Sequence, residues 1–145
     1  MKKLTRIVCI FLLIFLAGCK GYSLDSVPYL ISGKFVMEDN SSDYSICGAE
    51  IYLLNKSQKE VKAVNIIFYL FDKDGEPACE CRNKISVEME KELSAGEDSS
   101  FCISLDTYMN SIPEALLQID YLYIARIEYE DGSLWEDPFG LVAFN

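Results

Sequence analysis

The chain has 145 residues, of which 50% are hydrophobic and 25% charged, enough for one domain with a buried core. Its net charge of −10 argues against nucleic-acid binding, because phosphate contacts need clustered lysine and arginine. The chain contains no histidine, which excludes Ser-His-Asp and Cys-His catalysis and histidine-ligated zinc.

The first 18 residues have the layout of a secretory signal peptide. Lys2, Lys3 and Arg6 form a positively charged start, and residues 7–16 are all apolar. A run of this length is too short to cross a bilayer as a stable helix, which needs about 20 residues. The sequence therefore predicts that residues 1–18 are removed after export.

The apolar run ends in a motif that resembles a bacterial lipobox, Leu16-Ala17-Gly18-Cys19. In such a motif the cysteine thiol receives diacylglycerol, and the chain is then cut on the amino side of that cysteine. The small residues admit the peptidase, and Cys19 becomes the first mature residue. Two or more acyl chains, palmitate among them, hold a protein stably at a membrane. The alternative is an ordinary thiol at the end of a signal peptide.

Removal of residues 1–18 takes away three cations and no acidic residue, so the net charge changes from −10 to −13. Residues 19–30 are polar and contain Gly, Ser and Pro, which predicts a lipidated tether before a domain at residues 31–145. The expected location is the extracytoplasmic side of the cell envelope, at the outer membrane if the cell has two membranes. Apart from the lipid on Cys19, no cofactor or metal is expected.

The domain follows a period-2 hydrophobic pattern, which is typical of β-strands with one buried face. Ile85, Val87 and Met89 alternate with polar residues, whereas residues 64–71 are apolar on both faces, as in a central strand. A further one-sided stripe is expected at Ile119, Tyr121, Tyr123, Ala125, Ile127 and Tyr129. The expected strands are residues 31–39, 46–55, 61–71, 78–91, 99–106, 118–130 and 133–136.

Glycine-containing turns at residues 72–75, 94–97 and 131–132 separate these strands. One short helix is expected as a crossover, because Ser111 can cap it and Pro113 suits its first turn. Seven strands with this crossover predict an all-β, immunoglobulin-like antiparallel β-sandwich, with no second domain.

The central strand ends in a motif that resembles the F-x-L-Y/F-D signature of FxLYD-type domains. Here the motif consists of Phe68, Leu70, Phe71 and Asp72, and the similarity extends over about residues 46–130. Neighbouring segments fit as well: Asn55-Lys56-Ser57, Asp74-Gly75 and Ala95-Gly96-Glu97 before Phe101. FxLYD-type domains are small immunoglobulin-like modules of bacterial and archaeal surface proteins and lipoproteins. The resemblance implies architecture and location and brings no catalytic residues.

Four cysteines remain in the mature domain: Cys47, Cys79, Cys81 and Cys102. In an exported domain they predict two disulfides, and three connectivities are open. Cys79 and Cys81 lie two residues apart, so closure between them would strain an extended strand. A four-thiolate metal site departs from the usual C-x₂₋₄-C spacing. Free thiols in an anaerobic host are the remaining alternative.

Three other patterns have structural and functional interpretations. Residues 72–76, DKDGE, resemble part of a calcium loop, but Leu70 and Cys81 stand where acidic ligands are needed, which favours a hairpin turn. The acids Glu88, Glu90 and Glu92 alternate on one face, which is typical of a solvated edge strand rather than a carboxylate pair. Five aromatic residues could form either core or a carbohydrate or peptide platform, with core favoured: Tyr121, Tyr123, Tyr129, Trp135 and Phe139.

The sequence as a whole predicts a lipid-anchored binding or scaffolding domain without catalytic activity, acting through surface complementarity or an exposed sheet edge. An accessory structural subunit of an envelope complex is the alternative, and a small-molecule or glycan-processing enzyme is the third. The expected partners are the membrane, through the lipid, and an envelope protein.

Overall fold

A computed structural model of the chain describes residues 27–37, 41–78 and 83–143. These residues contain no helix, and so no helix among them is long and apolar enough to cross a membrane. They form seven β-strands: β1 (Tyr29–Val36), β2 (Gly48–Asn55), β3 (Val61–Phe71), β4 (Lys84–Leu93), β5 (Asp98–Ser104), β6 (Gln118–Tyr129) and β7 (Leu134–Glu136).

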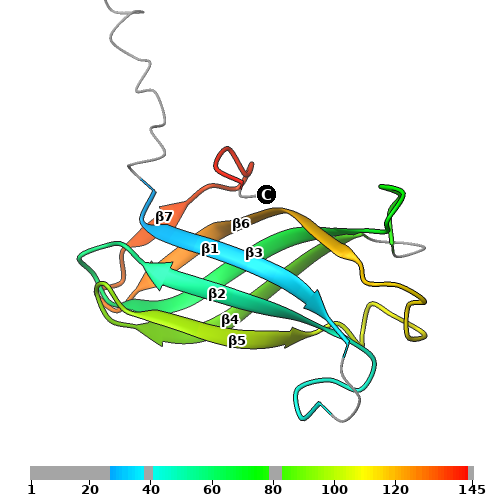
Figure 1. Cartoon of the computed structure of the whole chain (residues 1–145). Helices are drawn as coiled ribbons and strands as arrows, with labels where there is room; N and C mark the ends of the chain where they lie inside the picture. Colours follow the sequence, from blue (N-terminus) through cyan, green and yellow to red (C-terminus); the bar gives the residue numbers. More distant parts are fainter. Residues whose placement is uncertain (1–26, 38–40, 79–82, 144–145) are drawn as a thin grey trace, which may run out of the picture.

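The strands form two antiparallel sheets that face each other as a β-sandwich (Figure 1). One sheet has the order β1-β2-β5 and the other has the order β4-β3-β6-β7. The prediction of an all-β sandwich with about seven strands is confirmed. The strand with apolar residues on both faces is β3, which lies between β4 and β6, as a central strand should.

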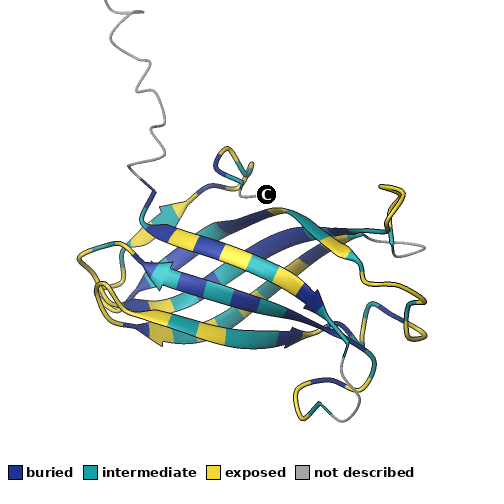
Figure 2. Ribbon diagram, in the orientation of Figure 1, coloured by how far each residue is buried: buried dark blue, intermediate teal, exposed yellow. Residues whose placement is uncertain are grey.

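Alternating side chains of both sheets fill the space between them (Figure 2). On β2 the buried residues are Ala49, Ile51 and Leu53, and on β3 they include Ile66 and Phe68. Along β4 and β5 the expected alternation is confirmed, since Ile85 and Ile103 are buried next to exposed polar residues. The period-2 pattern therefore identifies the core face of these strands correctly.

The predicted one-sided stripe on β6 is wrong at Tyr121 and Tyr123, because three register shifts interrupt the pairing of β3 with β6 and two of them add a residue to β6. One of these two shifts lies near Ala125 and the other near Tyr121. An added residue reverses which side chains face the core, so Leu122 and Ile124 are buried between the sheets.

The predicted helical crossover is also wrong: residues 105–117 connect β5 to β6 without a helix. Ile112 and Leu116, which would have formed its apolar face, are 61% and 63% exposed. A single turn of helix is costly to nucleate and is stabilised in proteins mainly by burying an apolar face. Because no such face is buried, a cap at Ser111 and a proline at the first turn, Pro113, are not enough to form a helix.

Asn55 ties together the β2–β3 and β4–β5 loops at the end of the sandwich where β1 begins. Its side-chain Nδ2 donates hydrogen bonds to the carbonyl oxygens of Lys59, Leu93 and Ser94, at 2.8, 3.1 and 3.0 Å. Its Oδ1 accepts from the amide and hydroxyl of Ser57. Because Asn55 is only 1% exposed, these bonds replace water for a buried amide.

A carboxylate at the opposite end makes the fold sensitive to acid. Asp106 accepts hydrogen bonds from the backbone amides of Ser45 at 2.7 Å and Ile46 at 2.8 Å, which lower the pKa of its carboxyl. Its contribution to stability is present above the pKa of an unfolded aspartate, about 3.9, and is lost as pH falls through the lower folded value. We expect urea midpoints to fall below about pH 4.

Two variants are compared. Asp106→Asn should flatten the acid dependence, and Asp98→Asn, at an exposed position on β5, is the control that should keep it. Urea titrations between pH 2 and 7 measure both. An unchanged acid slope in Asp106→Asn would contradict the assignment.

Candidate functional site

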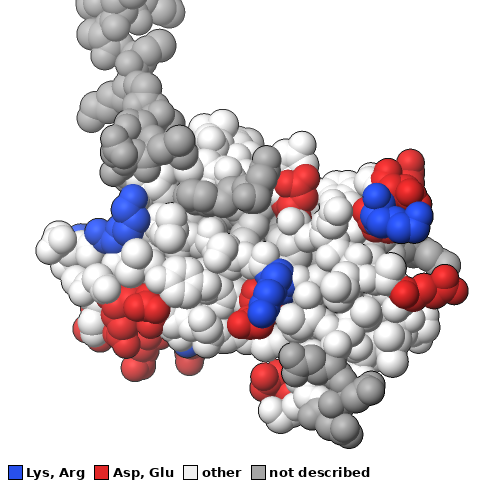
Figure 3. Space-filling model, viewed as in Figure 1, with Lys and Arg blue, Asp and Glu red and all other residues white. Residues whose placement is uncertain are grey.

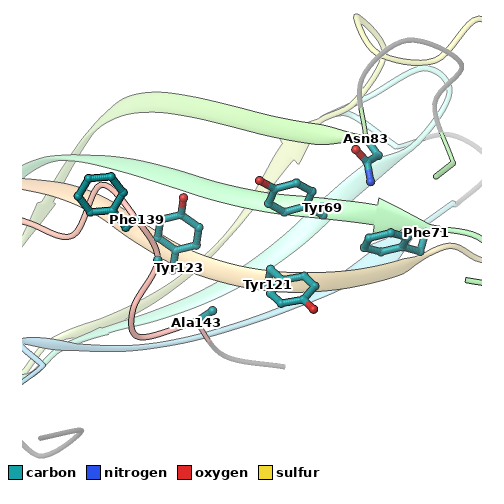
Figure 4. Close-up of a pocket in the computed structure, with 8 residues that line it drawn as sticks. Tyr69, Phe71, Asn83, Tyr121, Tyr123, Phe139 and Ala143 are labelled. Atoms are coloured by element: carbon teal, nitrogen blue, oxygen red, sulfur yellow. The ribbon is translucent and has the colours of Figure 1, made fainter. Parts of the chain in front are cut away.

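The outer face of the four-stranded sheet carries an aromatic pocket of about 330 Å³, at the low end of the range for small-ligand sites. The outward side chains of β3 and β6 form its floor, and the C-terminal segment forms one wall (Figure 4). We call it the aromatic pocket, and the side chains that line it include Tyr69, Phe71, Asn83, Tyr121, Tyr123 and Phe139.

The pocket follows from the apolar residues on both faces of β3. In an antiparallel sheet one face usually contacts water and is polar. On β3 the inward residues Phe68 and Leu70 are fully buried, while Tyr69 and Phe71 point outward and are half-buried. The outward side chains Tyr69 and Phe71 therefore line a pocket rather than a second core.

A β-bulge directs Tyr121 into this region. Tyr121 has a φ of 49°, and no other non-glycine residue in the described part of the chain has a positive φ. Its ring meets that of Tyr69 edge to face, with centroids 5.9 Å apart and an interplanar angle of 75°. A positive φ costs a bulky residue conformational energy, and such residues concentrate at binding sites. Tyr121 is also 53% exposed, so core packing does not explain its position.

The C-terminal segment closes over Tyr123, which is only 5% exposed although it points away from the core. Asp137 shapes that segment: its carboxylate accepts the backbone amides of Leu141 and Val142, both at 3.1 Å. The backbone amide of Asp137 donates to the carbonyl oxygen of Ala125 at 2.9 Å, which attaches the segment to β6. The wall of the pocket is thus held by a buried carboxylate and the bulged strand.

Gly140 sits against the ring of Tyr123 in this wall. A Cβ at residue 140 would lie 2.8 Å from the ring, and the φ of 63° is unfavourable for any side chain. We expect Gly140→Ala to destabilise the protein by about 2–4 kcal/mol, from overpacking added to the cost of a left-handed residue.

Gly132→Ala is the matched control, because Gly132 has a φ of 77° and a Cβ added there would have no atom within 4 Å. It should cost about 1–2 kcal/mol from the backbone alone. Urea denaturation and amide exchange at Leu141 and Val142 compare the two variants. Equal losses would show that the contact with Tyr123 does not hold the wall.

The described side chains that line the pocket are uncharged. The polar groups of the pocket are tyrosine hydroxyls and the amide of Asn83. Burial of the ring, and then the neighbouring Tyr69 hydroxyl and Asp137 carboxylate, raise the pKa of Tyr123, so it stays neutral at physiological pH. The opposite sheet faces the viewer in Figure 3, where acidic side chains lie in separate groups on a largely uncharged surface.

The predicted aromatic residues divide between core and surface. Tyr129 is buried in the core, and Trp135 packs edge to face on the buried Tyr29 at 5.5 Å between ring centroids. Tyr121 and Phe139, 53% and 82% exposed, lie at the pocket with Tyr123. The core prediction is therefore correct for Tyr129 and Trp135 and wrong for Tyr121 and Phe139.

The F-x-L-Y/F-D motif has a structural part and a pocket part. Phe68 and Leu70 are fully buried in the core, whereas Phe71 lines the pocket. Asp72 organises the turn after β3, since its Oδ1 accepts the amides of Asp74 and Glu76, each at 2.9 Å. These bonds and the antiparallel bridge between Phe71 and Pro77 close the predicted hairpin turn.

The lipobox residues Leu16, Ala17, Gly18 and Cys19, and the cysteines Cys79 and Cys81, lie outside the described residues. Cys47 is buried and faces the core, whereas Cys102 pairs with Glu50 on the outer face of the three-stranded sheet. The two predicted disulfides stay a prediction. The acids Glu88, Glu90 and Glu92 are exposed on β4, an edge strand, as expected.

Sequence reasoning missed Tyr69, Asn83 and the role of the C-terminal segment. The available signal was β3 itself, whose outer face is apolar where an antiparallel sheet is usually polar. Comparisons with protein-family models and with curated proteins find no match for this chain.

Proposed function

We propose that this protein is a lipid-anchored, extracytoplasmic binding module that holds its ligand in the aromatic pocket and catalyses no reaction. The observation that carries the proposal is an exposed aromatic site on a sheet face that core packing does not require. Exposed aromatic clusters mark binding surfaces in soluble domains. The described lining residues include no carboxylate, amine, thiol or serine hydroxyl, which favours binding over catalysis.

The strand order supports an immunoglobulin-like assignment. An immunoglobulin constant domain has the sheets ABED and CFG. Strands A to G correspond to β1 to β7 in chain order. Moving strand D beside strand C then gives the sheets ABE and DCFG, which are the observed orders β1-β2-β5 and β4-β3-β6-β7. Together with the F-x-L-Y/F-D motif, this order favours an FxLYD-type module of a bacterial lipoprotein.

The geometry suits an anchor at one end and a binding site toward the other. β1 begins beside Asn55 and the start of β3, where the predicted tether joins the domain (Figure 1). The seven residues between Cys19 and Val27 reach at most about 25 Å. Tyr69 lies about 26 Å along β3 from Val61, so the β3 side of the aromatic pocket lies far from the end where the predicted tether joins. In a cell with two membranes, we place the anchor in the outer membrane.

Crosslinking in intact cells tests this function even though the ligand is unidentified. A photoreactive benzophenone side chain replaces Phe139, which is 82% exposed, so the core is left intact. The same group at Leu134, 52% exposed on β7, is the control. We expect reproducible adducts from residue 139 alone, identified by mass spectrometry. No adduct, or the same adducts at both positions, would contradict a binding role for the pocket.

A further inference from the structure

The rings of the aromatic pocket form a corner rather than a flat platform. Tyr69 and Tyr121 stand nearly perpendicular, with an interplanar angle of 75°. Tyr69 comes from β3, Tyr121 and Tyr123 from β6, and Phe139 from the C-terminal segment (Figure 4). A flat sugar stacks best on a plane, whereas a compact rounded group can contact several rings that stand at an angle. Ring faces carry partial negative charge and attract cations.

The charges near the pocket favour the same kind of ligand. The carboxylate of Asp137 interacts electrostatically with Tyr123, and Asp120 directly precedes Tyr121. Asp72 and its turn follow Phe71. Lys84 pairs with Tyr69 in the strand ladder but does not line the pocket. With a net charge of −10, the whole chain adds a field that attracts cations and repels anions.

The hydrogen-bonding groups narrow the class further. The pocket offers tyrosine hydroxyls and one amide but no carboxylate among its described lining residues. A primary ammonium carries three donors that must be satisfied after leaving water, whereas a methylated ammonium carries few or none. An apolar, aromatic lining therefore suits a methylated cation better than a lysine-like amine.

We propose that the aromatic pocket binds a quaternary or otherwise methylated ammonium group by cation–π contact with Tyr69, Tyr121 and Phe139. The proposal rests on the proposed binding function and names the chemistry of its ligand. A volume of about 330 Å³ accommodates such a group with part of the molecule that carries it.

The test compares choline with 3,3-dimethyl-1-butanol, which has the same shape without the charge. Amide shifts of Tyr121 and Tyr123 in the full mature protein follow each titration by NMR. We expect saturable choline binding, at least tenfold tighter than that of the neutral alcohol. Tyr121→Ala should weaken choline binding at least fivefold, and Tyr121→Phe should restore it because the ring is kept. Leu134→Ala is the control and should leave binding unchanged.

Each other result overturns the proposal in an identifiable way. Equal affinity for the alcohol, or binding of a neutral oligosaccharide instead of choline, would remove the cation–π inference and leave the pocket as a binding site. No binding of any of these compounds, combined with no adduct from residue 139 in cells, would overturn both proposals. Choline binding that survives Tyr121→Ala unchanged would place the ligand elsewhere and overturn this inference.

Discussion

Asn55→Ala is expected to lower the free energy of unfolding by about 4 kcal/mol, a large part of the 5–15 kcal/mol typical of a domain. The substitution removes both the amide donor and the carbonyl acceptor of a residue that is 1% exposed. The carbonyl oxygens of Leu93 and Ser94 and the amide of Ser57 lose partners where water has little access. Each group left unsatisfied in this way costs about 1–3 kcal/mol.

Urea denaturation followed by circular dichroism measures the loss. The matched control is Asn65→Ala, on the outer face of β3, where the side chain makes one long contact of 3.4 Å with Ser86. That control should cost less than about 1 kcal/mol. Similar losses in the two variants would mean that Asn55 does not hold the two loops together.

Cys19→Ser is expected to abolish lipid attachment completely. Only the thiol of Cys19 can accept the diacylglycerol, since a serine hydroxyl is a far weaker nucleophile at neutral pH. Without acyl chains the protein should leave the membrane fraction, and its signal peptide should stay uncut. Metabolic labelling with an alkyne-bearing palmitate, membrane fractionation and the mass of the chain measure these effects.

Cys9→Ser is the matched control, because Cys9 lies in the same amino-terminal segment but within the apolar run. It should keep the lipid label, normal processing and membrane attachment. If Cys19→Ser kept the label, the lipobox interpretation would be wrong, and the location at the cell envelope would need another explanation.

The strands that could be predicted from the sequence are those whose pattern depends on local physics. Alternation at Ile85, Val87 and Met89 reflects which face meets water, and this holds whatever the partner strand is. Turns that contain Gly75, Gly96 and Gly132 were predictable because each needs a positive φ, observed at 81°, 78° and 77°.

The bulges in β6 could not be predicted because both phases of that strand are apolar. Leu122 and Ile124 fit the core as well as Tyr121 and Tyr123 do, and the register with β3 decides between them. The pocket depends on that choice. It also needs the C-terminal segment, whose position is fixed by the buried side chain of Asp137 and not by any local pattern.

Hydroxyl-radical footprinting on intact cells tests most directly whether the aromatic pocket is occupied where the protein works. Purified protein and protein in intact cells are oxidised under the same conditions, and reaction at each side chain is measured by mass spectrometry. We predict that Phe139 and Tyr121 react strongly in the purified protein and are protected on cells, while the exposed residues Ile112 and Leu134 react equally in both. Equal reactivity of Phe139 and Tyr121 in the two samples would contradict the assignment of the aromatic pocket as the binding site.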